Sequence, residues 1–218
     1  MRMKRGVIFD MDGLLFDTEV VYNKEWEKIA IQYGQVLDLR MLDETRGTNG
    51  ERLYKIVNSY WPKVDAKRLV SELFENAKQT LSQGAPMKPG VMELLEYFTT
   101  QGVRKAVASS SPMALILNNL NKAEIVSYFD VIISGDQVVH GKPAPDIFLM
   151  AADELGLPAS DCYVLEDGIH GVMAGLAAGC TTIMVPDLIA PDAELYEKCS
   201  GIYGSLLEVM EAIDKGEC

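Results

Sequence analysis

Two acidic residues lie directly after the first apolar run of the chain. In the segment RGVIFDMDGLLFDTE, residues 5–19, the run Gly6–Phe9 is apolar and contains two β-branched residues, a pattern typical of a short buried strand. Asp10 and Asp12 follow this run at once. Because burying a carboxylate costs free energy unless a partner compensates its charge, the pair indicates that a positively charged group lies nearby.

A second acidic pair follows another apolar run. Glu166 and Asp167 come directly after Cys162–Leu165. In an open parallel sheet, ligands bind at the carboxyl ends of the strands, so we expect both acidic pairs to meet at that edge. Carboxylate oxygens from two strand ends suit Mg²⁺, which commonly bridges one or two carboxylates to a phosphate. The predicted magnesium site contains Asp10, Asp12, Glu166 and Asp167.

Hydroxyl and ammonium groups are expected at the same edge. Ser109, Ser110 and Ser111 follow a further apolar run, and a helical pattern begins at Pro112. Ser110 or Ser111 is expected to cap that helix, whose free N–H groups can hold an anion. Ser109 is expected to donate directly to phosphate, and Ser109, Ser110 and Lys142 are the predicted substrate-binding residues. Lys142, in the loop HGKPAPD, supplies a mobile point charge for a phosphate oxygen and a carboxylate. These groups suit phosphoryl transfer, which depends mainly on positioning and charge neutralisation.

The elements that must position these residues alternate along the chain. Five apolar runs are predicted as strands: Gly6–Phe9, Val103–Ala108, Val131–Ser134, Cys162–Leu165 and Thr181–Val185. Four segments with apolar residues three and four apart are predicted as helices: residues 90–102, 112–125, 145–156 and 171–179. The alternation predicts an α/β fold, with a Rossmann-like parallel sheet and helices on both of its faces.

The first two predicted strands are separated by far more chain than a crossover requires. Residues 11–102 lie between them, whereas a parallel crossover needs only about a dozen residues. Roughly seventy residues are left over, which is far too many for an ordinary loop. Because this surplus contains three amphipathic helical patterns, we assign residues 16–85 to an inserted α-helical cap domain and residues 1–15 and 86–218 to the core.

Four motifs of this chain, in this order, resemble those of the haloacid dehalogenase superfamily. They are DMDGLLFDTE, VASSS, GKPAPDIF and LEDGIHGVMAGLAAGC. The resemblance is to the magnesium-dependent phosphatases and phosphomutases with a helical cap, including β-phosphoglucomutases, and it covers nearly the whole predicted core. An α/β core that performs phosphoryl transfer is therefore expected.

The resemblance also implies a mechanism and a role for each motif residue. Asp10 would attack phosphorus and form an aspartyl-phosphate, while Asp12 would protonate the leaving oxygen and then activate water. Ser109 and Lys142 would hold the phosphoryl group. The implied magnesium ligands are Asp10, the backbone carbonyl of Asp12, Asp167 and, directly or through another ligand, Glu166.

The resemblance leaves two reactions open. β-Phosphoglucomutases carry a cap histidine and a cap arginine that grips the second phosphate, and the corresponding places here are Tyr22 and Gly50. We therefore predict a phosphatase acting on a small phosphorylated metabolite, a sugar phosphate above all. The phosphomutase remains the alternative because Arg46 or Arg52 could replace the missing arginine.

A signalling module is a more distant alternative. Response-regulator receivers also place acidic residues, a Ser or Thr and a Lys on a parallel sheet. However, a receiver needs neither an acid-base group two residues after its phospho-accepting aspartate nor an inserted cap. Asp12 and the insert thus favour an enzyme.

The composition of the chain indicates which classes of partner and which compartment to expect. The 218 residues carry a formal net charge of −12, which disfavours binding to nucleic acid or an anionic membrane and favours a small-molecule partner. The four cysteines show no CxxC spacing, so reduced thiols are expected, and no uncharged apolar run is long enough for a membrane helix. The N-terminus shows no signal-peptide pattern. We expect a cytoplasmic protein that acts as a monomer.

Other polar and aromatic residues favour structural roles. Asp17 is expected to cap a helix or to stabilise the turn after Asp12. His140 and His170 each lie beside a glycine in predicted loops and are expected to be solvated. The aromatic residues expected to pack inside the cap are Trp26, Tyr33, Tyr54 and Trp61.

Overall fold

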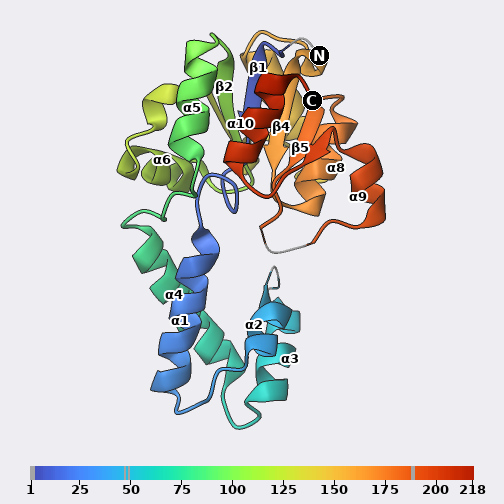
Figure 1. Cartoon of the computed structure of the whole chain (residues 1–218). Helices are drawn as coiled ribbons and strands as arrows, with labels where there is room; N and C mark the ends of the chain where they lie inside the picture. The colour runs from blue at the N-terminus through green and yellow to red at the C-terminus, as the bar shows by residue number, and fades with distance from the viewer. Residues whose placement is uncertain (1–2, 47, 49, 188–189) are drawn as a thin grey trace. The chain divides into compact units, whose positions relative to one another are not determined.

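The chain forms two compact units. The computed structural model describes residues 3–46, 48, 50–187 and 190–218. One unit, the core, extends through Asp17 and resumes with Pro86–Cys218; the other, the cap, is Thr18–Ala85 (Figure 1). The core thus includes Phe16 and Asp17, which we had assigned to the insert. The reason is local hydrogen bonding, since the Asp17 N–H donates to the Pro86 carbonyl at 2.8 Å.

A six-stranded parallel sheet lies at the centre of the core. Its strands are β1 (Gly6–Phe9), β2 (Arg104–Ser109), β3 (Val131–Ser134), β4 (Cys162–Glu166), β5 (Thr181–Met184) and β6 (Gly201–Ile202), in the spatial order β3-β2-β1-β4-β5-β6. Every strand pair is parallel. The predicted α/β class is confirmed. All five predicted strands are present with ends within one residue of the prediction, whereas the two-residue β6 was not predicted.

Helices follow the strands along the core. They are α5 (Val91–Thr100), α6 (Met113–Lys122), α7 (Asp146–Glu154), α8 (Ile169–Ala177), α9 (Ala193–Lys198) and α10 (Leu206–Lys215), with short 3₁₀ turns at Val126–Tyr128, Gly135–Gln137 and Ala159–Asp161. The four helices predicted in this region are present, whereas α9 and α10 were not predicted. Ser205 caps α10 by accepting a hydrogen bond from the Glu208 N–H, so its start follows an ordinary capping pattern.

Alternate residues of the strands pack on opposite faces of the sheet. On one face, Ile8 joins apolar side chains of α7 and α8 in a buried cluster. On the other face, the Phe9 ring lies edge-on to Phe98 of α5, with 6.1 Å between the ring centroids. Tyr163 extends this second layer against Phe98, and α10 packs beside α5 (Figure 1). Helices on both faces bury the apolar strands, as the sequence predicted.

The cap is entirely helical in its described residues. It contains α1 (Thr18–Gln32), α2 (Leu39–Thr45), α3 (Gly50–Tyr60) and α4 (Ala66–Leu81). Its buried centre includes Trp26 and Trp61, whose ring centroids are 6.1 Å apart, and Tyr33 and Tyr54 pack partly buried against it. The predicted packing role of these aromatics is thus observed. The short α2 was not predicted.

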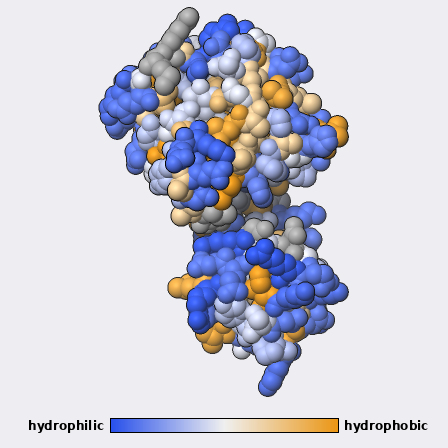
Figure 2. Space-filling model, turned by 90° about the vertical axis from the view of Figure 1, so that its right-hand side faces the viewer, coloured by the Kyte–Doolittle hydropathy of each residue, from blue (hydrophilic) through white to orange (hydrophobic). Residues whose placement is uncertain are grey.

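One face of the molecule is mostly hydrophilic at its edges (Figure 2). Figure 2 shows one face on which apolar residues are scattered among polar ones. Three of the most exposed large apolar side chains are those of Ile31, Val36 and Leu39 in the cap. Among the described residues, no helix is both long and apolar enough to cross a membrane.

Candidate active site

The sheet register brings the predicted site residues to one edge. β1 lies between β2 and β4, and Phe9 is level with both Val107 and Leu165. The Asp10 N–H continues the ladder by donating to the Leu165 carbonyl at 3.0 Å. Asp10 therefore leaves the sheet beside the last residue of β4, Glu166, because parallel strands end at a common edge.

Lys142 provides a positive partner for the buried carboxylates. Its Nζ lies 2.5 Å from Asp10 Oδ1 and 2.8 Å from Glu166 Oε1, and it donates to the Ala108 carbonyl at 3.2 Å. Only 8% of the Lys142 side chain is exposed, and its ammonium lies 4.9 Å from the centroid of the Phe148 ring. We expected a mobile charge, but three hydrogen bonds hold this ammonium in place.

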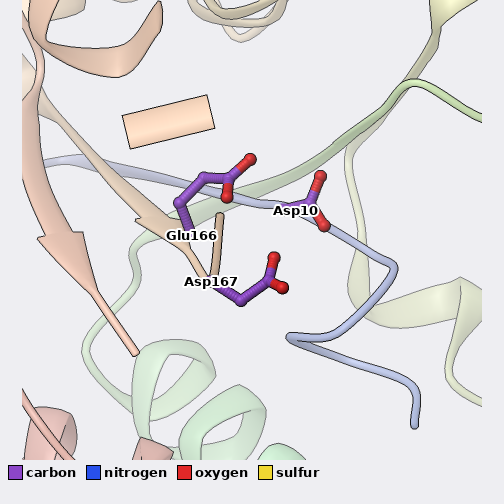
Figure 3. Close-up of side chains that lie close together, drawn as sticks. All are labelled: Asp10, Glu166 and Asp167. Atoms are coloured by element: carbon purple, nitrogen blue, oxygen red, sulfur yellow. The ribbon is translucent and has the colours of Figure 1, made fainter. Parts of the chain in front are cut away.

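Three carboxyl groups converge beside this lysine. Asp10, Glu166 and Asp167 each offer an oxygen, and these oxygens all lie within 4.8 Å of one another. Figure 3 shows the three carboxyl groups around a common space, with Asp10 at the end of one strand and the other two at the end of its neighbour. One lysine cannot balance three carboxylates, and hard oxygen donors are what Mg²⁺ binds. The donor set therefore fits a divalent cation.

Asp12 receives two hydroxyl hydrogen bonds. Ser111 Oγ donates to Asp12 Oδ2 at 2.8 Å and Ser109 Oγ donates to the same oxygen at 3.2 Å. The Ser111 N–H in turn donates to Ser109 Oγ at 3.0 Å. The prediction that a serine caps the following helix is wrong, because the N-cap residue of α6 is Pro112, without a side-chain hydrogen bond. Ser111 instead orients the carboxyl group of Asp12.

Two glycines leave room for the acidic side chains. A Cβ atom on Gly171 would lie 1.5 Å from Glu166 Oε1, and a Cβ atom on Gly13 would lie 2.2 Å from Asp167 Oδ2. Gly13 also has a φ of +89°, a conformation that residues with a side chain rarely adopt. The Gly168 N–H donates to Glu166 Oε2 at 2.8 Å, which holds the carboxylate over α8. Because Gly13 and Gly171 have no side chain, the carboxyl groups of Asp167 and Glu166 can occupy the space beside them.

Burial and mutual repulsion keep protons on this cluster when no cation is present. Burial, with the charges of Glu166 and Asp12, raises the pKa of Asp10 to about 8, although Lys142 opposes the shift. Burial, with the charges of Asp10 and Glu166, raises the pKa of Asp167 to about 9. Burial also raises the pKa of Asp12. A cation would displace the protons from groups that bind it.

Other predicted residues lie apart from the charged cluster. Ser110 is exposed, and its carbonyl oxygen would lie 2.7 Å from a Cβ atom on Gly135, so it packs on backbone. His140 is exposed and lies 3.0 Å from Asp146, while His170 is exposed on α8. The predicted exposure of both histidines is observed, but His170 lies in α8 rather than in the predicted loop.

A pocket of about 340 Å³ lies within the cap. Its lining includes Tyr22, Asn23, Trp26, Thr45, Arg46 and Phe74. Arg46 Nη1 lies 2.6 Å from Asp43 Oδ1, while Arg46 Nε is buried without a hydrogen-bond partner among the residues that the structure describes. The pocket therefore combines aromatic rings, hydroxyl and amide groups, one guanidinium and the carboxyl group of Glu19.

Tyr22 and Gly50 are the cap positions at which the resemblance led us to look for the histidine and arginine of a mutase. Tyr22 lines the cap pocket, and its ring lies edge-on to Phe74, with 6.0 Å between centroids. Gly50 begins α3 and is exposed, and as a glycine it offers no positively charged side chain at this position. Of the two replacement arginines considered, Arg46 lines the pocket, whereas the exposed Arg52 does not.

Comparisons with known proteins agree with the motifs. Residues 7–185 match the family model for haloacid dehalogenase-like hydrolases. "Phosphorylated carbohydrates phosphatase" of Thermotoga maritima is 33% identical over 179 residues, which cover 82% of this chain and 83% of that protein. "Probable pseudouridine-5'-phosphatase" of Drosophila melanogaster is 35% identical over 194 residues, covering 86% and 84% of the two chains.

A solved structure shares the complete architecture. A Thermotoga maritima protein, solved under the provisional name beta-phosphoglucomutase, superposes with a TM-score of 0.82 at 28% identity, covering 97% of this chain and 99% of its own. The predicted superfamily and enzyme class are confirmed, since the family is one of hydrolases and the relatives carry phosphatase names. The chain belongs to the haloacid dehalogenase-like hydrolase family.

Proposed function

We propose that this protein is a magnesium-dependent phosphatase that hydrolyses a small phosphorylated metabolite, foremost a sugar phosphate, through an aspartyl-phosphate on Asp10. The observation that carries the proposal is the convergence of Asp10, Glu166 and Asp167 on one buried edge with Lys142. Asp12 lies two residues after Asp10, with its carboxyl group held by two serine hydroxyls. These are a nucleophile, a cation site and an acid-base group.

In the first step, a carboxylate oxygen of Asp10 bonds to phosphorus while the bond from phosphorus to the leaving oxygen breaks. Asp12 gives its proton to that oxygen, a role supported by its raised pKa. In the second step, Asp12 takes a proton from a water molecule that attacks phosphorus, and inorganic phosphate leaves Asp10. Splitting the hydrolysis into two displacements replaces one difficult step with two easier ones.

The remaining groups would bind Mg²⁺ and neutralise the negative charge of the phosphoryl group. Asp10, the carbonyl of Asp12, and Asp167 would hold Mg²⁺, with Glu166 beside them, and the bound ion would neutralise the transferring phosphoryl group. Lys142 would exchange one of its three hydrogen bonds, and Ser109 its hydrogen bond to Asp12, to hold phosphoryl oxygens. In addition, Lys142 keeps the carboxylate of Asp10 oriented through its hydrogen bond to Oδ1.

The substrate class rests on the cap and on the relatives. Polar and aromatic side chains in the cap pocket suit a sugar, which presents hydroxyl groups and apolar ring faces. One relative is named for phosphorylated carbohydrates and the other for pseudouridine-5'-phosphate, and both names describe a phosphorylated sugar unit. We therefore place sugar phosphates first and nucleoside monophosphates second.

A phosphomutase is the second candidate because Arg46 lines the cap pocket. Its guanidinium already pairs with Asp43, which weakens its attraction for a second phosphate. We therefore expect water, rather than a sugar hydroxyl, to take the phosphoryl group from Asp10.

Two assays test the proposal. Turnover of p-nitrophenyl phosphate should require Mg²⁺, stop with EDTA and return when Mg²⁺ is added in excess; turnover in the chelated protein would contradict the cation's role. In the second assay, the protein is given β-glucose 1-phosphate with trace glucose 1,6-bisphosphate and Mg²⁺. Formation of glucose 6-phosphate with little free phosphate would identify a mutase, whereas we expect free phosphate from members of a sugar-phosphate panel without a bisphosphate activator.

A further inference from the structure

A partly buried ion pair lies beside the described site. Lys88 Nζ is 2.5 Å from Asp187 Oδ1, and only 20% and 14% of the two side chains are exposed. Lys88 belongs to the connection that enters the core at Pro86, and its N–H donates to the Leu15 carbonyl at 2.9 Å. Asp187 lies three residues beyond the end of β5. The pair therefore joins two loops on the core.

The other carboxylate oxygen of Asp187 is unsatisfied. Oδ2 is buried and has no hydrogen-bond partner among the residues that the structure describes. A buried charged oxygen without a hydrogen-bond partner loses the free energy of its hydration, and this loss exceeds the net contribution of a typical hydrogen bond. Such atoms therefore usually have a partner, for example an ordered water molecule or an ion. Lys88 satisfies only one side of this carboxylate.

Asp187 faces the same edge of the sheet as the acidic cluster. β5 pairs with β4 in a register that sets Met184 beside Glu166, and the Val185 N–H donates to the Glu166 carbonyl at 2.7 Å. Asp187 is also close enough for its charge to act on Asp167. However, it is not among the three residues whose oxygens lie within 4.8 Å of one another. It is therefore near the cation site without being a direct ligand.

We propose that Asp187 is a positioning residue for the magnesium site, with Oδ2 accepting a hydrogen bond from a water molecule bound to the cation and Lys88 fixing the carboxylate. This inference rests on the proposed function. Mg²⁺ keeps several of its waters when it binds protein, so an acceptor just outside the direct ligands has a partner available. Groups that orient such ligands typically change metal affinity by about 10- to 100-fold.

Three variants separate this role from a structural one. In Asp187→Asn the amide oxygen can still accept from Lys88, but the amide N–H₂ replaces Oδ2 and cannot accept from water. Lys88→Met removes the ion pair and keeps the acceptor. The double variant lacks both. The ion pair is weakened or lost in every variant, so a purely structural role predicts the same Mg²⁺ affinity for all of them.

The measurement is Mg²⁺ binding to the substrate-free protein by isothermal titration calorimetry, with urea unfolding of the metal-free variants alongside. We expect Asp187→Asn and the double variant to bind Mg²⁺ about 10- to 100-fold more weakly than wild type. Lys88→Met keeps the acceptor but no longer fixes it, so we expect a clearly smaller loss of Mg²⁺ affinity in this variant. Wild-type affinity in Asp187→Asn, or equal weakening in Lys88→Met, would overturn the inference. If the wild-type protein itself bound no Mg²⁺, both the proposed function and the inference about Asp187 would be wrong. That result can be distinguished from the two above, in which wild type binds Mg²⁺ and only the inference fails.

Discussion

The core site and the cap pocket are built from different kinds of groups. In the core, Lys142 and the carboxyl groups of Asp10 and Glu166 contact one another directly, and all three side chains are less than a tenth exposed. In the cap, the guanidinium of Arg46 and the carboxyl group of Glu19 lie among aromatic rings, hydroxyls, an amide and aliphatic side chains, in a pocket of about 340 Å³. Dense, buried charge suits chemistry on a phosphoryl group, whereas a mixed lining suits discrimination among organic groups. The difference indicates that reaction and selectivity can be altered separately.

The largest expected effect is loss of the nucleophile. Asp10→Asn should abolish phosphate release, because the amide is close in shape but neither attacks phosphorus nor binds Mg²⁺ well. Steady-state kinetics with p-nitrophenyl phosphate and with the best sugar phosphate would measure it. Asp161→Asn, which changes only a surface ion pair with Arg5, is the matched control. Turnover near the wild-type rate in Asp10→Asn would remove the covalent mechanism.

Asp12→Ala should also lower the turnover of every substrate. We expect turnover to fall by about two to four orders of magnitude, the usual contribution of an acid-base group. Ser111→Ala removes only one hydrogen bond to the Asp12 carboxyl group and should cost much less. If both variants lost activity equally, the orientation of Asp12 rather than its proton transfer would explain the loss.

Gly171→Ala tests whether the packing of Glu166 matters for chemistry. The new methyl group would overlap Glu166 Oε1, so this side chain must move away from Lys142. We expect turnover to fall by about a hundredfold from misplaced catalytic groups and the free energy of unfolding to fall by about 1–3 kcal/mol. His170→Ala, an exposed change one residue earlier in α8, controls for effects on the helix. Unchanged kinetics in Gly171→Ala would show that Glu166 tolerates displacement.

A cap variant should change selectivity rather than chemistry. Arg46→Ala removes the guanidinium from the pocket, and we expect kcat/KM for the preferred sugar phosphate to fall by about tenfold or more relative to p-nitrophenyl phosphate. Tyr54→Ala, which alters cap packing without reaching the pocket, is the control. An equal loss on both substrates would mean that Arg46 does not discriminate between them.

The last expected effect concerns stability rather than activity, and it is a dependence on pH. Asp10 and Asp167 have raised pKa values of about 8 and about 9 in the folded protein, against 3.8 for both groups in the unfolded chain. The folded state therefore holds more protons between these limits, so the stability of the metal-free protein should fall as pH rises through them. Because Mg²⁺ replaces those protons, its effect on the melting temperature should increase from about pH 5 to about pH 9. A pH-independent effect of Mg²⁺ would contradict the shared acidic site.

Much of the core could be predicted from local patterns. The apolar runs before Asp10 and Glu166 are short and bounded by polar residues, so the strand ends could be assigned within one residue. Once a parallel sheet is inferred, the convergence of these residues follows, because parallel strands end at one edge. The elements that were missed are short or lie near the C-terminus: α2, β6, α9 and α10.

The sequence by itself determined the α/β class, the inserted cap, and the carboxylates and lysine that meet at the sheet edge. Only the tertiary structure decided that Ser111 contacts Asp12 and that Asp187 Oδ2 has no partner among the described residues. It also decided that Arg46 lines the cap pocket while Arg52 does not. The physical reason is that secondary structure follows from spacing along the chain, whereas these contacts depend on side-chain direction and on packing between segments distant in sequence.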